Sequence, residues 1–283
     1  MKSYILPEAL YGLDGINEIL YDKENCILHK KLNEDIIDSE KLIVSHSIVY
    51  IVHGNVQVNT FDGHEVSIGK GEMLFMPRDS YLISDYVTKN RGLEAYLIFF
   101  NHDIVEKFLN GFFTSNKIHN SICKIETNRN IKSFFENIMQ MHYEEKNSSV
   151  LLELKILEFL NLVVDTRFKE TLFASEMSKK RRTIESLMLE HYDKNLSVLD
   201  YASLSGRSLS TFNREFKKIH IKTPKQWLIE KKMDKANYLL KDGVSVTESA
   251  AEVGYKNISH FIKAYKSIYN QTPKEMQQLL NFI

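Results

Sequence analysis

The sequence predicts an α+β protein of two domains, a β-barrel or jelly roll with a helical hairpin followed by an all-α domain. Short apolar runs separated by turn residues fill the first hundred positions, and a helical periodicity replaces them near Asn101. The last hundred residues repeat one helical unit twice. A chain of 283 residues is long enough for two ordinary domains. We expect a domain over 1–170, a linker over 171–182 and a second domain over 183–283.

The N-terminal part carries the signals of closely spaced strands. Asp62-Gly63 is a strong hairpin signal, and the preceding Val56-Gln57-Val58-Asn59 alternates between apolar and polar side chains. Short strands separated by such turns favour a small barrel or a jelly roll. The strands are expected at 48–52, 56–61, 66–68, 73–76, 81–83 and 95–100.

A pair of helices is expected over 130–168, with a break at 146–149. Apolar residues of the second helix, over 150–164, cover more than one face, so something besides the barrel must cover part of it. We expect a second copy of the chain there, which makes a homodimer. The alternative is a monomer in which the first helix covers that face. The interval 170–182 is polar, charged and aperiodic, which is typical of a linker.

The C-terminal repeat is the most informative feature of the sequence. A shift of 49 residues places Ala202 on Ala251, Phe212 on Phe261 and Thr223-Pro224 on Thr272-Pro273. A repeat of this length encodes one supersecondary unit used twice.

Helix boundaries recur at matching places in the two copies. Ser197-x-x-Asp200 and Ser245-x-x-Glu248 are capping boxes that open a short helix, and a glycine follows each helix. Ser208 and Asn257 are N-cap types that begin a second helix. A helix, a turn containing Gly and another helix form the helix-turn-helix plan. Between the copies we expect one linker helix over 224–240.

Charge is divided unevenly along the chain, although the formal net charge is zero. Residues 1–175 contain 18 Lys and Arg against 25 Asp and Glu, whereas residues 176–283 contain 19 against 12. A basic region next to an acidic one indicates a polyanionic partner for the basic region.

Other classes of protein are disfavoured by the composition. The longest apolar run, 95–100, is far shorter than the ~20 residues of a membrane span. The N-terminus lacks the apolar core of a secretory signal, so we expect a cytoplasmic protein without a membrane partner. Cys26 and Cys123 are expected to be reduced thiols. No nucleophile elbow or phosphate loop occurs, and we expect no enzyme and no cofactor.

The second helix of each copy carries side chains of the types needed to read a major groove of DNA. Because Phe212 and Phe216 are four residues apart and face inward, the polar residues between them face outward. Arg and Lys donate to guanine, Asn pairs with adenine, and Ser suits either base. The expected base-reading residues are Ser210, Asn213, Arg214, Ser259, His260 and Lys263. The expected phosphate-binding residues are Arg207, Lys217, Lys218, Lys256 and Lys266.

The region 198–277 resembles the AraC/XylS family of bacterial regulators. The resemblance lies in Phe212-x-Arg214-x-Phe216-Lys217-Lys218, Ala250-Ala251-x-Val253-Gly254-Tyr255 and the two Thr-Pro pairs. It implies a sequence-specific transcriptional regulator, an activator, whose partners are double-stranded DNA and RNA polymerase. The base-reading residues above match the family's positions.

This chain departs from the family pattern at a few positions. Ile221 and Asn270 stand where the family usually has Gly, and Lys232 and Lys263 stand where Arg is usual. Asn tolerates a left-handed conformation and Ile does not, so the first recognition helix is expected to end differently from the second. Lysine lacks the planar fork of arginine, which puts base selectivity at Lys263 in doubt.

The region 48–77 resembles the cupin-type sensing domain that often precedes this module, and the chain also looks loosely like the branch that activates type III secretion genes. Three interpretations stay open for the N-terminal domain: a receptor for a small-molecule effector in the barrel, a module controlled by a regulatory protein, or a cupin-type metal-dependent enzyme with a DNA-binding tail. His46, His53 and His64 offer no His-x-His pair, so we expect no metal and place these histidines at turns or edges.

Overall fold

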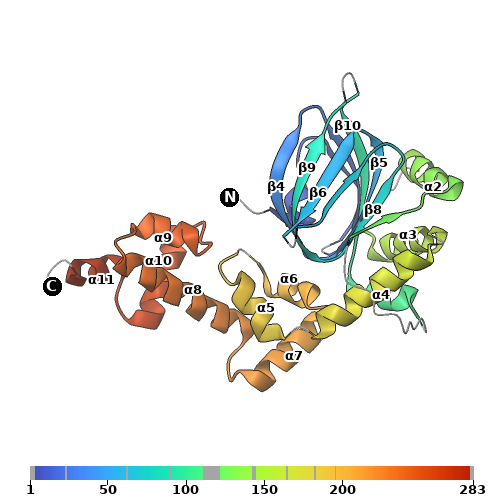
Figure 1. The fold of residues 1–283 in the computed structure, drawn as a ribbon. Helices are drawn as coiled ribbons and strands as arrows, with labels where there is room; N and C mark the ends of the chain where they lie inside the picture. Colours follow the sequence, from blue (N-terminus) through green and yellow to red (C-terminus); the bar gives the residue numbers. More distant parts are fainter. Residues whose placement is uncertain are drawn as a thin grey trace. The chain divides into compact units, whose positions relative to one another are not determined.

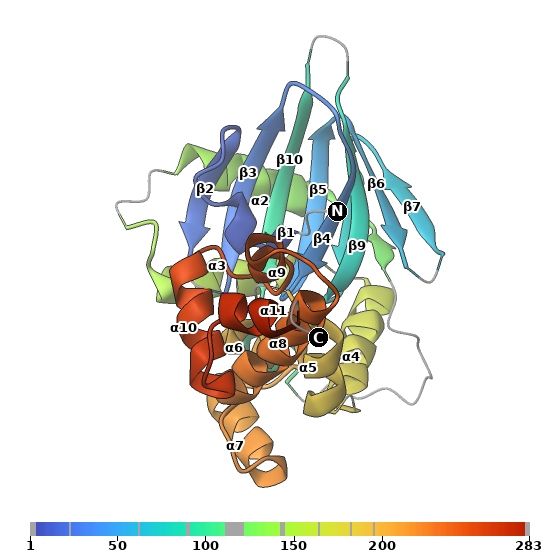
Figure 2. The same cartoon turned by 90° about the vertical axis from the view of Figure 1, so that its left-hand side faces the viewer.

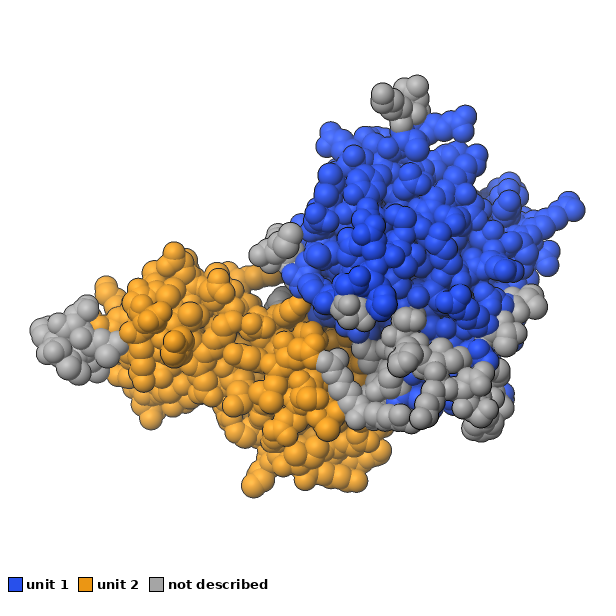
Figure 3. Space-filling model, viewed as in Figure 1, with its two compact units in different colours: residues 1–181 blue, residues 182–283 orange. Residues whose placement is uncertain are grey.

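The computed structural model describes residues 4–22, 24–61, 63–88, 91–110, 122–141, 145–163, 165–181, 183–194 and 196–280. The chain divides into two compact units, unit 1 (residues 1–181) and unit 2 (residues 182–283) (Figure 1, Figure 3). Unit 1 contains all the described strands and unit 2 contains only helices, so the predicted fold class is confirmed.

Two sheets make up most of unit 1. Their strand orders are β1-β4-β9-β6-β7 and β11-β8-β5-β10-β3-β2, and all the pairs are antiparallel except β1 with β4. Figure 2 shows β2, β3, β10 and β5 side by side. The strands are β1 (Tyr4–Leu6), β2 (Ile16–Tyr21), β3 (Cys26–Leu32), β4 (Ile36–Ile43), β5 (His46–His53), β6 (Asn55–Thr60), β7 (Glu65–Ile68), β8 (Met73–Met76), β9 (Asp79–Tyr86), β10 (Leu93–Phe100) and β11 (Cys123–Ile125); a short 3-10 helix, η1 (Glu8–Leu10), follows β1.

The six strands expected from the sequence are confirmed as β5 to β10. The hairpin signal lies between β6 and β7, which pair antiparallel. Asp62 lies outside the described residues, and Gly63 has a φ of 90°, a conformation that favours glycine. Strands β1 to β4 were not individually predicted, because charged residues interrupt their apolar alternation, as in Asp38-Ser39-Glu40-Lys41 of β4.

The six-stranded sheet is apolar on both faces. In β10, Ala95, Leu97 and Phe99 join the core between the two sheets, whereas Tyr96 and Ile98 join a second core under the helices. A strand buried on both sides reads as a continuous apolar run, which explains the run at 95–100.

The α-helices in the described part of unit 1 are α1 (His102–Phe108), α2 (Arg129–Gln140), α3 (Ser149–Leu162) and α4 (Thr166–Arg181). The expected pair is confirmed as α2 and α3. The linker expected over 171–182 is corrected, because residues up to Arg181 belong to α4, whose Phe168 and Leu172 are fully buried in the second core. The apolar periodicity did not predict this helix, because its buried face also carries the polar residues Thr171, Ser175 and Glu176.

Unit 2 contains α5 (Ile184–His191), α6 (Val198–Leu204), α7 (Leu209–Ile219), α8 (Pro224–Lys241), α9 (Val246–Glu252), α10 (Ile258–Tyr269) and α11 (Pro273–Leu280). Helices α6 and α7 form the first helix-turn-helix, α9 and α10 form the second, and α8 joins them as the predicted linker helix. The capping boxes at Ser197 and Ser245 are both present.

The two recognition helices end differently, as predicted. Asn270, after α10, is left-handed with a φ of 56°. His220, after α7, is extended, with φ −120° and ψ 136°, and Ile221 is fully exposed. A β-branched residue cannot take the left-handed conformation cheaply, so the chain leaves α7 in an extended conformation.

Among the residues that the structure describes, no helix is both long and apolar enough to cross a membrane.

Candidate nucleic-acid interface

Helix α7 buries one aromatic face and exposes a polar one. Phe212 and Phe216 are fully buried, and the Phe216 ring meets Trp227 of α8 edge-on, with centroids 6.1 Å apart. This packing fixes the rotation of α7 about its axis. The opposite face carries Ser210, Arg214, Lys217 and Lys218, all exposed.

Asn213 differs from its neighbours on α7. It is half-buried, and its Nδ2 donates to the carbonyl oxygen of Leu209 at 2.9 Å. Its Nδ2 has two hydrogens, so one can stay in this intrahelical bond while the other and Oδ1 are free for a bidentate contact to adenine.

Helix α10 repeats the arrangement. Phe261 and Tyr265 are fully buried, and the Tyr265 hydroxyl donates to Asn237 Oδ1 of α8 at 2.7 Å. The residues predicted from the sequence are all exposed: Lys256, which precedes the helix, and Ser259, His260, Lys263 and Lys266 on it.

Hydrogen bonds to α8 hold α10 in place, and the sequence did not predict them. The Tyr269 hydroxyl donates to Asp234 at 2.9 Å, next to the Tyr265–Asn237 bond. Buried tyrosines normally find a hydrogen-bond partner, which was the available signal, but the partner was not readable from the sequence.

Arg207 behaves differently from the other predicted phosphate-binding residues. Its Nε donates to Glu215 Oε2 at 2.7 Å, its guanidinium also donates to the Ser205 carbonyl at 3.0 Å, and its side chain is only 15 % exposed. These bonds connect the turn of the first helix-turn-helix to α7. We therefore leave Arg207 out of the phosphate-binding set.

Three charged side chains among the described residues of unit 1 lie together inside the two-sheet body. Asp85 Oδ2 lies 2.7 Å from Lys30 Nζ and 3.2 Å from Lys41 Nζ, and all three residues are buried. Burial lowers the pKa of Lys30 to about 8, whereas the two ammonium groups outweigh burial and lower the pKa of Asp85. The adjoining cavity is small, at about 30 Å³.

A second buried cluster corrects the position expected for His46. Instead of lying at a turn or edge, His46 is fully buried, and its Nε2 is 2.7 Å from Glu176 Oε1 of α4. Arg78 donates to the same oxygen at 2.6 Å. Burial alone would raise the pKa of Glu176, but the charge of Arg78 and the His46 hydrogen bond lower it to about 2.

The other two histidines considered from the sequence are not buried. His53 is half-exposed and His64 is exposed. Within the described ranges, no three His, Cys, Asp or Glu side chains come together as metal ligands. Cys26 and Cys123 are buried free thiols.

Known proteins resemble both parts of the chain. Residues 46–175 match the model of the ExsA N-terminal regulatory domain, and residues 201–278 match that of a helix-turn-helix domain. The thermoregulatory protein LcrF of Yersinia pestis is 23 % identical over 247 residues, covering 82 % of this chain and 90 % of that protein. The HTH-type transcriptional regulator ExsA of Pseudomonas aeruginosa is 22 % identical over 242 residues, covering 82 % and 85 %.

A solved structure also aligns over most of the chain. The apo ToxT K231A structure from Vibrio cholerae covers 92 % of this chain and 99 % of its own, with 13 % identity and a TM-score of 0.45.

The matched regulatory domain, the matched helix-turn-helix domain and the two exposed recognition faces agree with the resemblance found in the sequence. This chain belongs to the AraC/XylS family of DNA-binding transcriptional regulators.

Proposed function

We propose that unit 2 binds duplex DNA by placing α7 and α10 in two successive major grooves. The observation that carries this proposal is the repeated exposed polar face of the two helices, each fixed by a pair of buried aromatic rings. A single such face is common on any solvated helix. Two at equivalent positions of a repeat favour a shared partner.

The base-reading set is Ser210, Asn213, Arg214, Ser259, His260 and Lys263. Arg214 presents a planar fork that suits guanine O6 and N7, whereas Lys263 offers a single point charge. The first helix should therefore discriminate bases more sharply than the second. The phosphate-binding set is Lys217, Lys218, Lys256 and Lys266, whose ammonium groups contact backbone oxygens regardless of sequence.

Helix α8 sets the spacing of the two recognition helices. Its 18 residues correspond to a length of about 27 Å at 1.5 Å per residue. Successive major-groove faces are about 34 Å apart, so a strut of this length suits two adjacent turns on one side of the duplex.

Unit 1 would control this binding and activate transcription in concert with RNA polymerase. The match to a regulatory domain supports control by a signal, either a small molecule or a regulatory protein. The relatives are transcriptional regulators, which favours a non-catalytic protein over the cupin-type enzyme considered from the sequence. Acting on bacterial DNA, the protein would work in the cytoplasm.

The salt dependence of DNA binding tests the proposal. With phosphate contacts from the four lysines of this set, the affinity of the full chain for its duplex site should fall with a log–log slope of about −4 against salt concentration. Fluorescence anisotropy with a labelled duplex measures the slope. A folded protein that binds no duplex at low salt would refute the proposal.

The two kinds of signal are separable by ligand-dependent melting. A small-molecule effector raises the melting temperature of the purified chain, since it binds the folded state. A module controlled by a protein does not respond to metabolites in this assay.

A further inference from the structure

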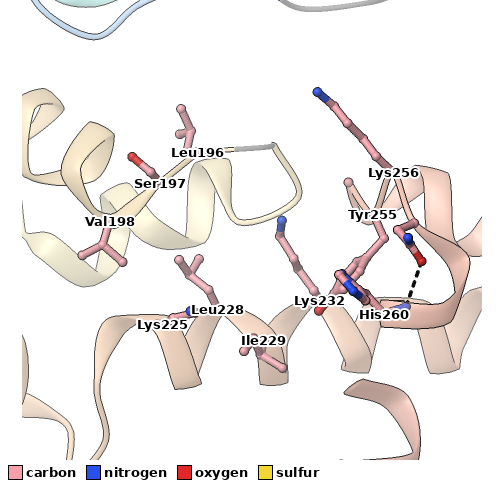
Figure 4. A pocket seen from close by; sticks show the side chains of 12 residues that line it. Leu196, Ser197, Val198, Lys225, Leu228, Ile229, Lys232, Tyr255, Lys256 and His260 are labelled. Carbon is pink, nitrogen blue, oxygen red and sulfur yellow. Dashed lines mark hydrogen bonds between the residues drawn. The ribbon is translucent and has the colours of Figure 1, made fainter. Parts of the chain in front are cut away.

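Helix α8 joins two lobes of unit 2, a first lobe of α5 to α7 and a second lobe of α9 to α11. A pocket of about 570 Å³ lies between them, and Leu228 and Lys232 of α8 line it from below (Figure 4). Residues 196–198 line it on the side of the first lobe, and Tyr255 and Lys256 line it on the side of the second. Because the pocket separates the lobes at this place, their relative orientation depends on how each lobe is attached to α8.

The first lobe is attached to α8 at points far apart along the helix. Near the beginning of α8, the Trp227 ring meets the Phe216 ring of α7 edge-on, with centroids 6.1 Å apart. Further along, Lys235 Nζ donates to Asp193 Oδ2 at 2.8 Å and lies 6.0 Å from the centre of the Tyr192 ring. The axial distance between Trp227 and Lys235 is about 12 Å at 1.5 Å per residue. Attachments this far apart resist tilting of the lobe on α8.

The second lobe is attached to the same turn of α8 that carries Lys235. The Tyr265 hydroxyl donates to Asn237 Oδ1 at 2.7 Å, and the Tyr269 hydroxyl donates to Asp234 Oδ1 at 2.9 Å. On a helix of 3.6 residues per turn, positions 234 and 237 are about 60° apart, whereas position 235 is about 100° or more from both. One turn of α8 therefore holds the two lobes on different sides.

The two tyrosine hydroxyls occur only in the second copy of the repeat. The shift of 49 residues places Tyr265 on Phe216 and Tyr269 on His220. The rings of Phe216 and His220 both pack near Trp227, each with its centroid 6.1 Å from that of the indole. A recognition helix thus packs on α8 without such hydroxyls. In α10 they add a directional constraint, because a hydrogen bond weakens steeply when its angle changes.

We infer that Asp234, Lys235 and Asn237 are positioning residues that fix both lobes on one turn of α8 and so restrict the protein to DNA sites with a single spacing between their two segments. This inference rests on the proposed function. Inserting one base pair moves one segment by about 3.4 Å along the duplex and rotates it by about 34°. The lobes could follow that change only by giving up these bonds.

Selection of bound duplexes from a random-sequence pool by the full chain tests the inference. The unchanged protein should recover sites with one spacing. Tyr265→Phe combined with Tyr269→Phe removes both hydroxyls and keeps both rings, and this variant should recover sites with several neighbouring spacings. Its preference for the selected site over the same site with one inserted base pair should fall about fivefold, which corresponds to about one hydrogen bond. Its affinity for the selected site itself should change less than this preference does.

Changes at the first lobe and a matched control complete the experiment. Lys235→Met removes the donor to Asp193 and should also relax the spacing. Lys235→Arg can still pair with Asp193 and should keep the single spacing. Tyr238→Phe is the same chemical change at a tyrosine of α8 whose side chain is 70 % exposed, and it should behave as the unchanged protein does.

A single spacing in every variant would overturn the inference. An equal loss of affinity at all spacings would also overturn it, because that result indicates groups that only stabilise the fold. Relaxed spacing in Tyr238→Phe or in Lys235→Arg would count against it as well.

A distance measurement without DNA separates the inference from the proposed function. Nitroxide labels at Lys218→Cys and Ser267→Cys, exposed equivalent positions on α7 and α10, report the distance between the recognition helices by pulsed electron paramagnetic resonance, since Cys26 and Cys123 are buried. The distance distribution should be broader in the double tyrosine variant than in the labelled chain without it, and equal widths would contradict the inference. Broadening in a chain that recovers no duplex would refute DNA binding and still support the attachment of both lobes to α8.

Discussion

Arg214 and Lys218 both lie exposed on α7, but their side chains suit different tasks. Arginine presents paired donors in a fixed plane, whereas lysine presents one mobile charge. The same helix therefore offers one residue for selectivity and one for affinity, and comparing the two tests the orientation of α7.

Arg214→Ala should weaken binding to the preferred duplex by about 1–3 kcal/mol and blur selectivity at one base pair. Lys218→Ala should weaken binding to all duplexes alike, because phosphates carry no sequence information. Competition binding with single-base variants of the site measures both effects. A uniform loss in both variants would show that α7 enters the groove in another orientation.

Glu176 joins α4 to the sheet through Arg78 and His46. The stability that this carboxylate contributes to the fold should depend on pH. A carboxyl whose folded pKa, about 2, is below its unfolded value contributes stability that is present above the unfolded pKa and is lost as pH falls toward the folded pKa. From a reference value of 4.5, the contribution is of order 3 kcal/mol and should disappear between about pH 4.5 and pH 2.

Glu176→Gln tests this expectation. The variant should unfold more easily at pH 7 and show a shallower loss of stability with acid, measured by urea unfolding at several pH values. Glu158→Gln, at an exposed carboxylate on α3, is the control and should follow the unchanged protein. Identical acid dependence in all three proteins would contradict the assignment.

At the scale of elements, the sequence did not decide what covers the apolar surface of α3, a second copy of the chain or the neighbouring helix. In α3, Leu160 is fully buried and Leu157 is half-buried, so neither side chain belongs to an exposed stripe. The exposed apolar residues are Val150, which is 70 % exposed, and Leu154, which is 59 % exposed, one helical turn apart. A stripe at this place is where we expect a second copy to pack.

Val150→Glu combined with Leu154→Glu should convert a dimer of the full chain to monomers while leaving the fold intact, since neither side chain lies in the core. Sedimentation at tens of micromolar measures the change, with Leu13→Glu, at another exposed apolar residue of unit 1, as the control. A monomeric unchanged protein, with and without DNA, would rule out the dimer.

At the scale of the whole molecule, the repeat in unit 2 predicts the shape of the footprint on DNA. Two recognition helices held by α8 should protect two segments about 10 base pairs apart on one face of the duplex. Hydroxyl-radical footprinting of the full chain measures this spacing. Lys263→Ala combined with Lys266→Ala should remove protection at one segment only. Loss of protection at both segments would show that the two helix-turn-helix units do not bind separately.

The sequence by itself determined the features that depend on neighbours along the chain. Capping boxes at Ser197 and Ser245, the aromatic pairs four residues apart and the left-handed Asn270 are local, so their signals lie within a few positions. Because the capping boxes and the aromatic pairs occur in both copies of the repeat, each copy supported the prediction for the other, and together they indicated the family. Strands β5 to β10 were predictable for a similar reason, since alternation and turn residues are short-range patterns.

Only the tertiary structure decided which distant groups meet. Glu176 pairs with His46 and Arg78, which are 130 and 98 residues away, and this contact turns a polar segment expected to be a linker into a packed helix. The buried side of α3, the pairing of Arg207 with Glu215 and the contacts of α8 with both lobes were likewise not readable from spacing. The physical reason is that three-dimensional packing decides which side chains are buried and which charges pair. The periodicity of a short segment does not show which distant residue it contacts.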